Sequence, residues 1–215
     1  MKNFAIVLSG CGVYDGAEIH ESVCAMLAVC RKGHKYQIFA PDIPQHHVIN
    51  HLNGSAMPEE RNVMVEAARI ARGNVLELST FKPSDYDALI FAGGYGAAKN
   101  LSDFAFKDKD YSVIEQVSSI IKSTHNAGKP IGAMCIAPVL IADALDGIEL
   151  TLGALSPASE AAEKHGATHI VTSHGEVAVD KKNKIATTPC YMLDATIAHV
   201  AKGAENLVDE LIKLM

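Results

Sequence analysis

Short, unbroken apolar runs alternate with segments of helical periodicity through the first two-thirds of the chain. The runs Phe4–Leu8, Ala88–Ala92 and Pro130–Met134 do not alternate apolar and polar residues, so each predicts a strand that is buried on both faces. Further strands are expected at Tyr36–Ala40 and Val75–Leu78, and helices at Ala17–Lys32, Glu59–Arg72, Tyr111–Ala127 and Ile136–Leu145. This alternation predicts an α/β fold, with a doubly wound, mostly parallel sheet and helices on both faces.

The last third of the chain has a different pattern. Short strands are predicted at Glu149–Leu152, His169–Val171, Glu176–Val179 and Lys184–Thr187, with helices at Pro157–His165 and Asp194–Met215. Gly203 lies inside the second of these helices and is a candidate position for a break. The 215 residues contain no internal repeat and no Pro/Gly-rich linker, which predicts a single domain over residues 1–215.

Composition and charge argue against several classes of function. A hydrophobic content of 48% is typical of a soluble globular protein. The net charge of −6, without a run of five or more like charges, argues against binding to nucleic acid or to a membrane surface. The apolar run near the N-terminus is too short for a signal peptide or a membrane span. An odd cysteine count without a C-x-x-C pair predicts free thiols and a cytoplasmic location; the five are Cys11, Cys24, Cys30, Cys135 and Cys190.

The segment Lys129–Leu140 is the strongest candidate for a catalytic element. A buried strand ends there and a helix begins, with Cys135 at the junction, which is the arrangement of a nucleophile elbow. Backbone N–H groups at a helix start favour a thiolate and could hold an oxyanion. The alternative is that Cys135 is a small buried hydrophobe, as most free cysteines are.

Two further loops should lie near Cys135, because the carboxyl ends of parallel strands meet at one edge of a sheet. These loops are Ser9–Gly16 and Gly93–Asn100. Gly93 and Gly94 follow a buried strand directly, so they would let backbone N–H groups approach a reacting atom, or they form a plain tight turn. Glu18 and Glu21 share one helix face near this edge, where either could reach a thiol or simply compensate the helix dipole.

Other patterns give weaker predictions. The spacing from Gly10 to Gly16 is one residue too long for a dinucleotide-binding fingerprint. His46, His47 and His51 lie in an irregular segment without metal-ligand spacing, so neither a metal nor a cofactor is expected. Cys11 should be exposed at the site edge, whereas Cys24 and Cys30 are expected in the core.

Three stretches in order, and on the expected elements, point to a known family. They are Gly16–Glu21 (GAEIHE), Gly93–Leu101 (GGYGAAKNL) and Gly132–Pro138 (GAMCIAP). With them, the chain resembles the ThiJ/PfpI superfamily, within the class I glutamine amidotransferase-like fold. Four further stretches make it similar to the ElbB branch: Ser9–Gly16, Val48–Leu52, Arg61–Val63 with Glu66–Ile70, and Thr187–Pro189.

The resemblance implies a flavodoxin-like sandwich, a homodimer and a nucleophilic Cys135. It also implies that Glu21 hydrogen-bonds this thiol and that the N–H groups of Gly94 and Ile136 form the oxyanion hole. Similar proteins are described as glutathione-independent glyoxalases, and some relatives as protein deglycases. The ElbB branch is also linked by name to isoprenoid biosynthesis.

Two departures from family patterns limit the function. PfpI-type peptidases place a histidine directly after the nucleophile, where this chain has Ile136. Glutamine amidotransferases need a late His-x-Glu pair, and His174-Gly175-Glu176 has that spacing but a glycine in the middle. Peptidase and amidotransferase activity are therefore disfavoured, and His174 is the best positional candidate for a third catalytic group.

The leading hypothesis is a cofactor-free glyoxalase that acts on small 2-oxoaldehydes such as glyoxal and methylglyoxal. Cys135 would form a hemithioacetal, and Glu21 would move a proton through an enediol. We expect Glu21 to be protonated at neutral pH and to donate a hydrogen bond to a Cys135 thiolate. The alternative is a redox or carbonyl-stress sensor, or a protein deglycase, that uses the same cysteine. The long segment Asp42–Pro58 is expected to lie against a second subunit.

Overall fold

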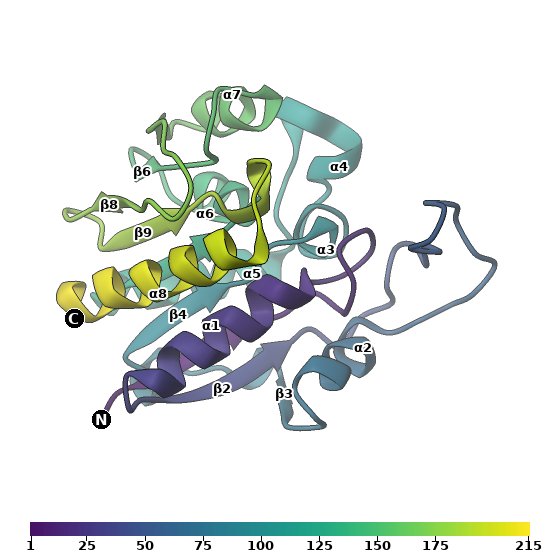
Figure 1. Ribbon diagram of the computed structural model, residues 1–215, viewed down its shortest axis with the longest axis horizontal. Helices are drawn as coiled ribbons and strands as arrows, with labels where there is room; N and C mark the ends of the chain where they lie inside the picture. The colour runs from purple at the N-terminus through teal and green to yellow at the C-terminus, as the bar shows by residue number, and fades with distance from the viewer.

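The computed structural model describes residues 1–215 and is built on a seven-stranded sheet with helices on both faces (Figure 1). The strand order is β3-β2-β1-β4-β5-β9-β8, and every neighbouring pair is parallel except β8 and β9. The strands are β1 (Asn3–Val7), β2 (Lys35–Ala40), β3 (Val75–Glu77), β4 (Ala88–Phe91), β5 (Ile131–Met134), β8 (Ala178–Asp180) and β9 (Ile185–Thr188). The predicted doubly wound, mostly parallel sheet is confirmed.

Two apolar clusters fill the space between the sheet and its helices. One side is covered by α1 (Ile19–Arg31), α2 (Val63–Ile70) and α8 (Ile197–Leu214), and Figure 1 shows α1 and α8 side by side. The other side is covered by α3 (Tyr95–Lys99), α5 (Glu115–Asn126), α6 (Pro138–Ala144) and α7 (Pro157–Lys164). The central strands are buried on both faces, as their unbroken apolar runs predict.

The remaining elements are short. They are the helix α4 (Phe104–Lys107), the parallel strands β6 (Glu149–Leu150) and β7 (Thr168–His169), and the 3₁₀ turns η1 (Leu78–Thr80), η2 (Pro83–Asp85), η3 (Asp108–Asp110) and η4 (Cys190–Met192). The sequence pattern did not reveal α3 inside the predicted loop Gly93–Asn100, nor α4, because helices of four or five residues carry no periodic signal.

Helices α2, α5 and α6 begin at Val63, Glu115 and Pro138, later than predicted. Helix α2 begins at Val63 because the Asn62 side chain accepts a hydrogen bond from the Val65 N–H group and caps it. Helix α5 begins at Glu115, and Tyr111 lies outside it, where its hydroxyl donates a hydrogen bond to the Val139 carbonyl. Helix α6 begins at Pro138, three residues after Cys135.

The proposed break in the last helix is wrong. Helix α8 runs without interruption through Gly203. A Cβ atom at Gly203 would lie 2.9 Å from the Thr188 Oγ1 atom, so this glycine lets α8 pack closely against the end of β9. Gly203 therefore has a packing role within a continuous helix.

The segment Asp42–Pro58 is irregular, as expected, and extends away from the body of the protein between β2 and α2 (Figure 1). Its few backbone pairings are the isolated bridges Pro44–Asn62 and Ile49–Ala56. That this segment packs on a second subunit remains a prediction. None of the helices is both long and apolar enough to cross a membrane.

Candidate functional site

Cys135 occupies a sharp turn between β5 and α6. Its backbone has a φ angle of 58°, in the left-handed region that residues with a side chain rarely adopt. The turn is held because the Cys135 N–H group donates to the Thr188 carbonyl at 3.0 Å. A strained residue at the carboxyl end of a central strand is the geometry predicted for a nucleophile elbow.

The Glu21 side chain, which comes from α1, is fully buried and faces Cys135. Its carboxyl group lies beside the Cys135 side chain, since a Cβ atom at Gly93 would collide with the Glu21 Oε2 atom and lie 2.5 Å from the Cys135 Cβ atom. The carboxyl group also accepts a hydrogen bond from the Gly93 N–H group at 3.1 Å. The Tyr191 N–H group approaches the other carboxyl oxygen at 3.4 Å. Of the two predicted acids, Glu21 is therefore the one in contact with the thiol.

Glu18 has a different role. It is the N-cap residue of α1, and its carboxylate accepts a hydrogen bond from the Glu21 N–H group at 2.7 Å. This is the helix-start contact that the alternative interpretation gives to an acid at this position. Glu18 thereby fixes the first turn of the helix that carries Glu21.

Gly93 and Gly94 bring the end of β4 against the thiol. A Cβ atom at Gly93 would lie 2.5 Å from the Cys135 Cβ atom and would also collide with the Glu21 carboxylate, so no other residue fits. The N–H groups of Gly94 and Ile136 lie near enough to the Cys135 sulfur to lower the pKa of the thiol. The predicted donors are thus in place beside the thiol, and their use as an oxyanion hole remains a prediction.

Burial has the largest effect on the pKa values of Glu21 and Cys135. It raises the pKa of Glu21 to about 8, and the neighbouring Glu18 carboxylate adds to this effect. Burial also raises the pKa of the Cys135 thiol, and a charged Glu21 would raise it further. The N–H groups of Gly94 and Ile136 lower this pKa, but by less than burial raises it.

The predicted protonation of Glu21 at neutral pH agrees with this raised pKa. The prediction that the helix start makes Cys135 a ready thiolate is wrong, because the thiol is buried and α6 begins three residues later. The two groups titrate as a coupled pair, in which the loss of one proton leaves a single shared negative charge.

A pocket of about 250 Å³ opens on the thiol; we call it the Cys135 pocket. Nine of its ten lining residues are hydrophobic. They come from the loop after β1, the start of α3, α4, the elbow and η4, and are Val13, Gly94, Tyr95, Ala98, Phe104, Ala105, Cys135, Ile136, Tyr191 and Met192. The pocket therefore lies at the carboxyl edge of the sheet, where the sequence predicts the site.

The predicted third group does not join this site. The His174 ring contacts the Asp194 carbonyl at 3.0 Å and stacks on His199, while Glu176 accepts a hydrogen bond from the nearby Ser173 N–H group. Neither His174 nor Glu176 lines the Cys135 pocket. His174 and Glu176 are therefore not part of the site around the Cys135 thiol.

The remaining cysteines are not at the pocket. Cys11 is half-buried, and burial raises the pKa of its thiol. Cys24 is buried as expected, whereas Cys30 is exposed, so its assignment to the core is wrong. Cys30 lies near the end of α1, on the side that faces solvent, and the apolar pattern of the helix did not distinguish these two positions.

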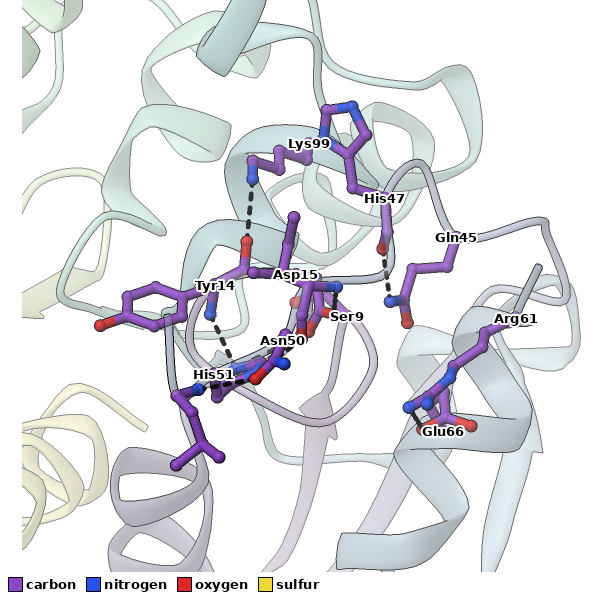
Figure 2. Close-up of polar contacts among 12 residues, drawn as sticks. Ser9, Tyr14, Asp15, Gln45, His47, Asn50, His51, Arg61, Glu66 and Lys99 are labelled. Carbon is purple, nitrogen blue, oxygen red and sulfur yellow. Dashed lines mark hydrogen bonds and ion pairs between the residues drawn. The ribbon is translucent and has the colours of Figure 1, made fainter. Parts of the chain in front are cut away.

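No group of three His, Cys, Asp or Glu side chains has the arrangement of a metal site. Of the three loop histidines, His46 and His47 lie against the Phe106 ring. His51 accepts a hydrogen bond from the Tyr14 N–H group at 3.2 Å and stacks on the Tyr14 ring. Asp15 accepts one from the Ile49 N–H group at 2.6 Å. Lys99 donates to the Tyr14 carbonyl at 2.8 Å, as Figure 2 shows. These contacts hold the extended segment to the loop that carries Val13, a wall of the Cys135 pocket.

Two residues at the site were missed by sequence reasoning. Tyr191 lines the Cys135 pocket, and its hydroxyl lies 2.8 Å from the His20 Nδ1 atom. The signal for Tyr191 was its place just after Thr187–Pro189, a stretch that follows a strand and matches the family. His20 stands beside Glu21 in a second matching stretch, so both could have been singled out.

Comparison with known proteins gives relatives over nearly the whole chain. Glutamine amidotransferase-like class 1 domain-containing protein 3, mitochondrial, from Homo sapiens is 46% identical over 98% of this chain and 82% of its own length. ES1 protein, mitochondrial, from Danio rerio is 34% identical over 99% of this chain and 86% of its own length. No protein-family model matches the sequence.

Solved structures agree with the fold. An isoprenoid biosynthesis protein with an amidotransferase-like domain from Ehrlichia chaffeensis superposes with a TM-score of 0.91 and 31% identity, over 99% of this chain and 100% of the other. Glyoxalase III from Candida albicans superposes with a TM-score of 0.61 and 16% identity, over 97% of each chain. The second likeness is evidence for the fold alone.

Proposed function

Because the chain belongs to the family of ES1 and glutamine amidotransferase-like class 1 domain-containing proteins, within the ThiJ/PfpI superfamily, we propose that it is a cofactor-independent glyoxalase. Its substrates would be 2-oxoaldehydes such as glyoxal and methylglyoxal, and its products 2-hydroxy acids. The observation that carries the proposal is the buried Glu21 carboxyl group beside Cys135, with an apolar pocket open to the thiol. A cytoplasmic location is part of the proposal.

The reaction would begin with addition of the Cys135 sulfur to the aldehyde carbon. The thiol proton passes to the Glu21 carboxylate in the singly ionised pair, and the new oxyanion accepts hydrogen bonds from the N–H groups of Gly94 and Ile136. Glu21 then donates the proton that it took from the thiol to this oxygen, which gives a neutral hemithioacetal and restores the carboxylate that acts as the base in the next step.

Glu21 would then move a proton between two carbons. The carboxylate removes the proton from the carbon bonded to sulfur, which gives an enediol. The Glu21 carboxyl group then exchanges this proton with solvent through the open pocket and protonates the neighbouring carbon. The product is a thioester of a 2-hydroxy acid. Water attacks the thioester carbon, the carbon–sulfur bond breaks, and the hydroxy acid leaves with regeneration of the thiol.

Peptidase and amidotransferase functions have less support. The residue after the nucleophile is Ile136, and His174 and Glu176 make contacts away from the thiol. A histidine base beside the nucleophile is what both of those activities need.

The proposal predicts that metal-free protein forms lactate from methylglyoxal and that Cys135→Ala abolishes this activity. A matched control is Cys30→Ala, which removes an exposed thiol outside the pocket and should leave the rate unchanged. Lactate would be measured over time in the presence of a metal chelator. No lactate above the Cys135→Ala background would refute the proposal, and peroxide-dependent oxidation of Cys135 without turnover would then favour the sensor.

A further inference from the structure

We infer that the Cys135 pocket selects uncharged aldehydes with an apolar substituent larger than methyl, and excludes aldehydes and amino acids that carry a carboxylate. The inference rests on the proposed function for the aldehyde group, which reacts with the thiol. The preference for an uncharged, apolar substituent follows from the lining residues, the nearby charges and the volume of the pocket.

The side chains that line the pocket offer few hydrogen-bond partners to a polar substituent of the substrate. The only polar side-chain groups among the lining residues are the Cys135 thiol and the hydroxyls of Tyr95 and Tyr191. The Tyr191 hydroxyl already contacts His20, and the Tyr95 side chain is 53% exposed at the rim. A substrate seated on Cys135 therefore meets mainly aliphatic and aromatic carbon.

The charges around the pocket disfavour an anionic ligand. No Lys, Arg or His side chain lines it, whereas Glu21 lies buried against its thiol and Glu18 lies one turn away. The Lys99 ammonium, which lies 5.2 Å from the centre of the Tyr95 ring, is held by the Tyr14 carbonyl. A substrate carboxylate would lose water without gaining a cationic partner, which is strongly unfavourable.

The volume exceeds what a two-carbon or three-carbon substrate needs. An apolar cavity of about 150 Å³ is enough to hold a benzene molecule. The Cys135 pocket, at about 250 Å³, has room for such a group in addition to the reacting aldehyde. Glyoxal and methylglyoxal would leave most of the apolar lining uncovered.

Binding can be tested without turnover, because simple aldehydes form reversible hemithioacetals with the thiol. Acetaldehyde, propanal, butanal, hexanal, phenylacetaldehyde and glyoxylate would each be titrated as protectants of Cys135 against alkylation. The Cys135 peptide would be read by mass spectrometry. Each half-protecting concentration would be divided by the dissociation constant of the same aldehyde with N-acetylcysteine, which removes differences in intrinsic reactivity.

We expect the normalised half-protecting concentration to fall about fourfold for each added methylene from acetaldehyde to butanal. Hexanal and phenylacetaldehyde should bind more tightly than propanal, and glyoxylate at least about tenfold more weakly than propanal. A flat series, or glyoxylate that protects as well as propanal, would overturn the inference.

A variant that adds a charge at the rim of the Cys135 pocket provides a second test. Ala105 is an exposed lining residue on the short helix α4, so a longer side chain can be accommodated there. Ala105→Lys should lower the normalised half-protecting concentration of glyoxylate about tenfold, and Ala105→Met, an unbranched side chain of similar length without a charge, should not. Equal glyoxylate binding by the two variants would contradict the electrostatic part of the inference.

The outcomes separate this inference from the proposed reaction. If the aldehydes follow the predicted order but no 2-oxoaldehyde yields a hydroxy acid, the reaction fails and the selectivity of the pocket stands. If methylglyoxal is converted by a Cys135-dependent route but the aldehyde series is flat, the reaction stands and the inference is wrong.

Discussion

Replacing Glu21 by Gln is expected to lower kcat/KM for methylglyoxal by about a hundredfold to ten-thousandfold, the range associated with the loss of a general base. The amide can still lie beside Cys135 and donate a hydrogen bond, but it cannot accept the carbon-bound proton. Hemithioacetal formation should therefore continue while formation of the hydroxy acid stops. Steady-state kinetics and protection of Cys135 from alkylation would measure these two steps separately.

The matched control is Glu18→Gln, because Glu18 is a second buried acid one turn away on the same helix. Weakening the N-cap of α1 should cost about 1 kcal/mol of stability and less than about tenfold in kcat/KM. Equal kinetic losses in the two variants would mean that Glu21 acts only by supporting the helix.

The pH dependence of kcat/KM should reflect the ionisation of Glu21 and Cys135. The reactive form has lost one proton, since attack on an aldehyde requires thiolate character. Burial raises the pKa of Glu21 to about 8, so kcat/KM should rise with pH and level off above about pH 8. In Glu21→Gln the buried thiol must ionise alone, and the rise should move to higher pH. A wild-type profile that is flat between about pH 6 and 9 would contradict this assignment.

Gly93→Ala is expected to have the largest effect on stability. The new methyl group would lie 2.5 Å from the Cys135 Cβ atom and 2.9 Å from the Met134 carbonyl oxygen. These atoms belong to a central strand and its elbow, which cannot shift without disturbing the sheet. The free energy of unfolding should fall by about 3 kcal/mol or more, the upper end of the cost of overpacking, and the melting temperature by about 6 to 12 °C.

Gly33→Ala serves as the control for this prediction. Gly33 has a φ angle of +72°, and a Cβ atom there would have no neighbour within 4 Å. This change should cost only about 1 to 2 kcal/mol of left-handed strain. Urea unfolding of both variants would compare them, and equal losses would show that the close approach at Gly93 is relieved by relaxation.

The sheet and the elbow could be predicted because their signals are local. The runs Phe4–Leu8, Ala88–Ala92 and Pro130–Met134 carry enough unbroken apolar sequence to identify central strands, and they match β1, β4 and β5 within one residue at each end. The edge-of-sheet rule then brings Cys135, Glu21 and the Gly93 turn together from three distant segments.

The parts that were missed depend on tertiary contacts. Tyr111, predicted to be helical, lies outside α5 and hydrogen-bonds the distant Val139 carbonyl, and Gly203 lies in an unbroken α8 that packs closely against the end of β9. The thiolate prediction considered only local backbone dipoles, whereas burial of Cys135 depends on every element packed around it. The contact between His20 and Tyr191 joins residues 171 positions apart, and neither carries a periodic signal.

The most direct test of the proposed mechanism is to follow methylglyoxal with the protein in D₂O by proton NMR. If Cys135 forms the hemithioacetal and Glu21 moves the proton through an enediol, lactate accumulates with deuterium at C2, and its methyl signal is a singlet. Cys135→Ala should produce none. Lactate whose methyl signal remains a doublet, or no lactate above the Cys135→Ala background, would contradict the mechanism.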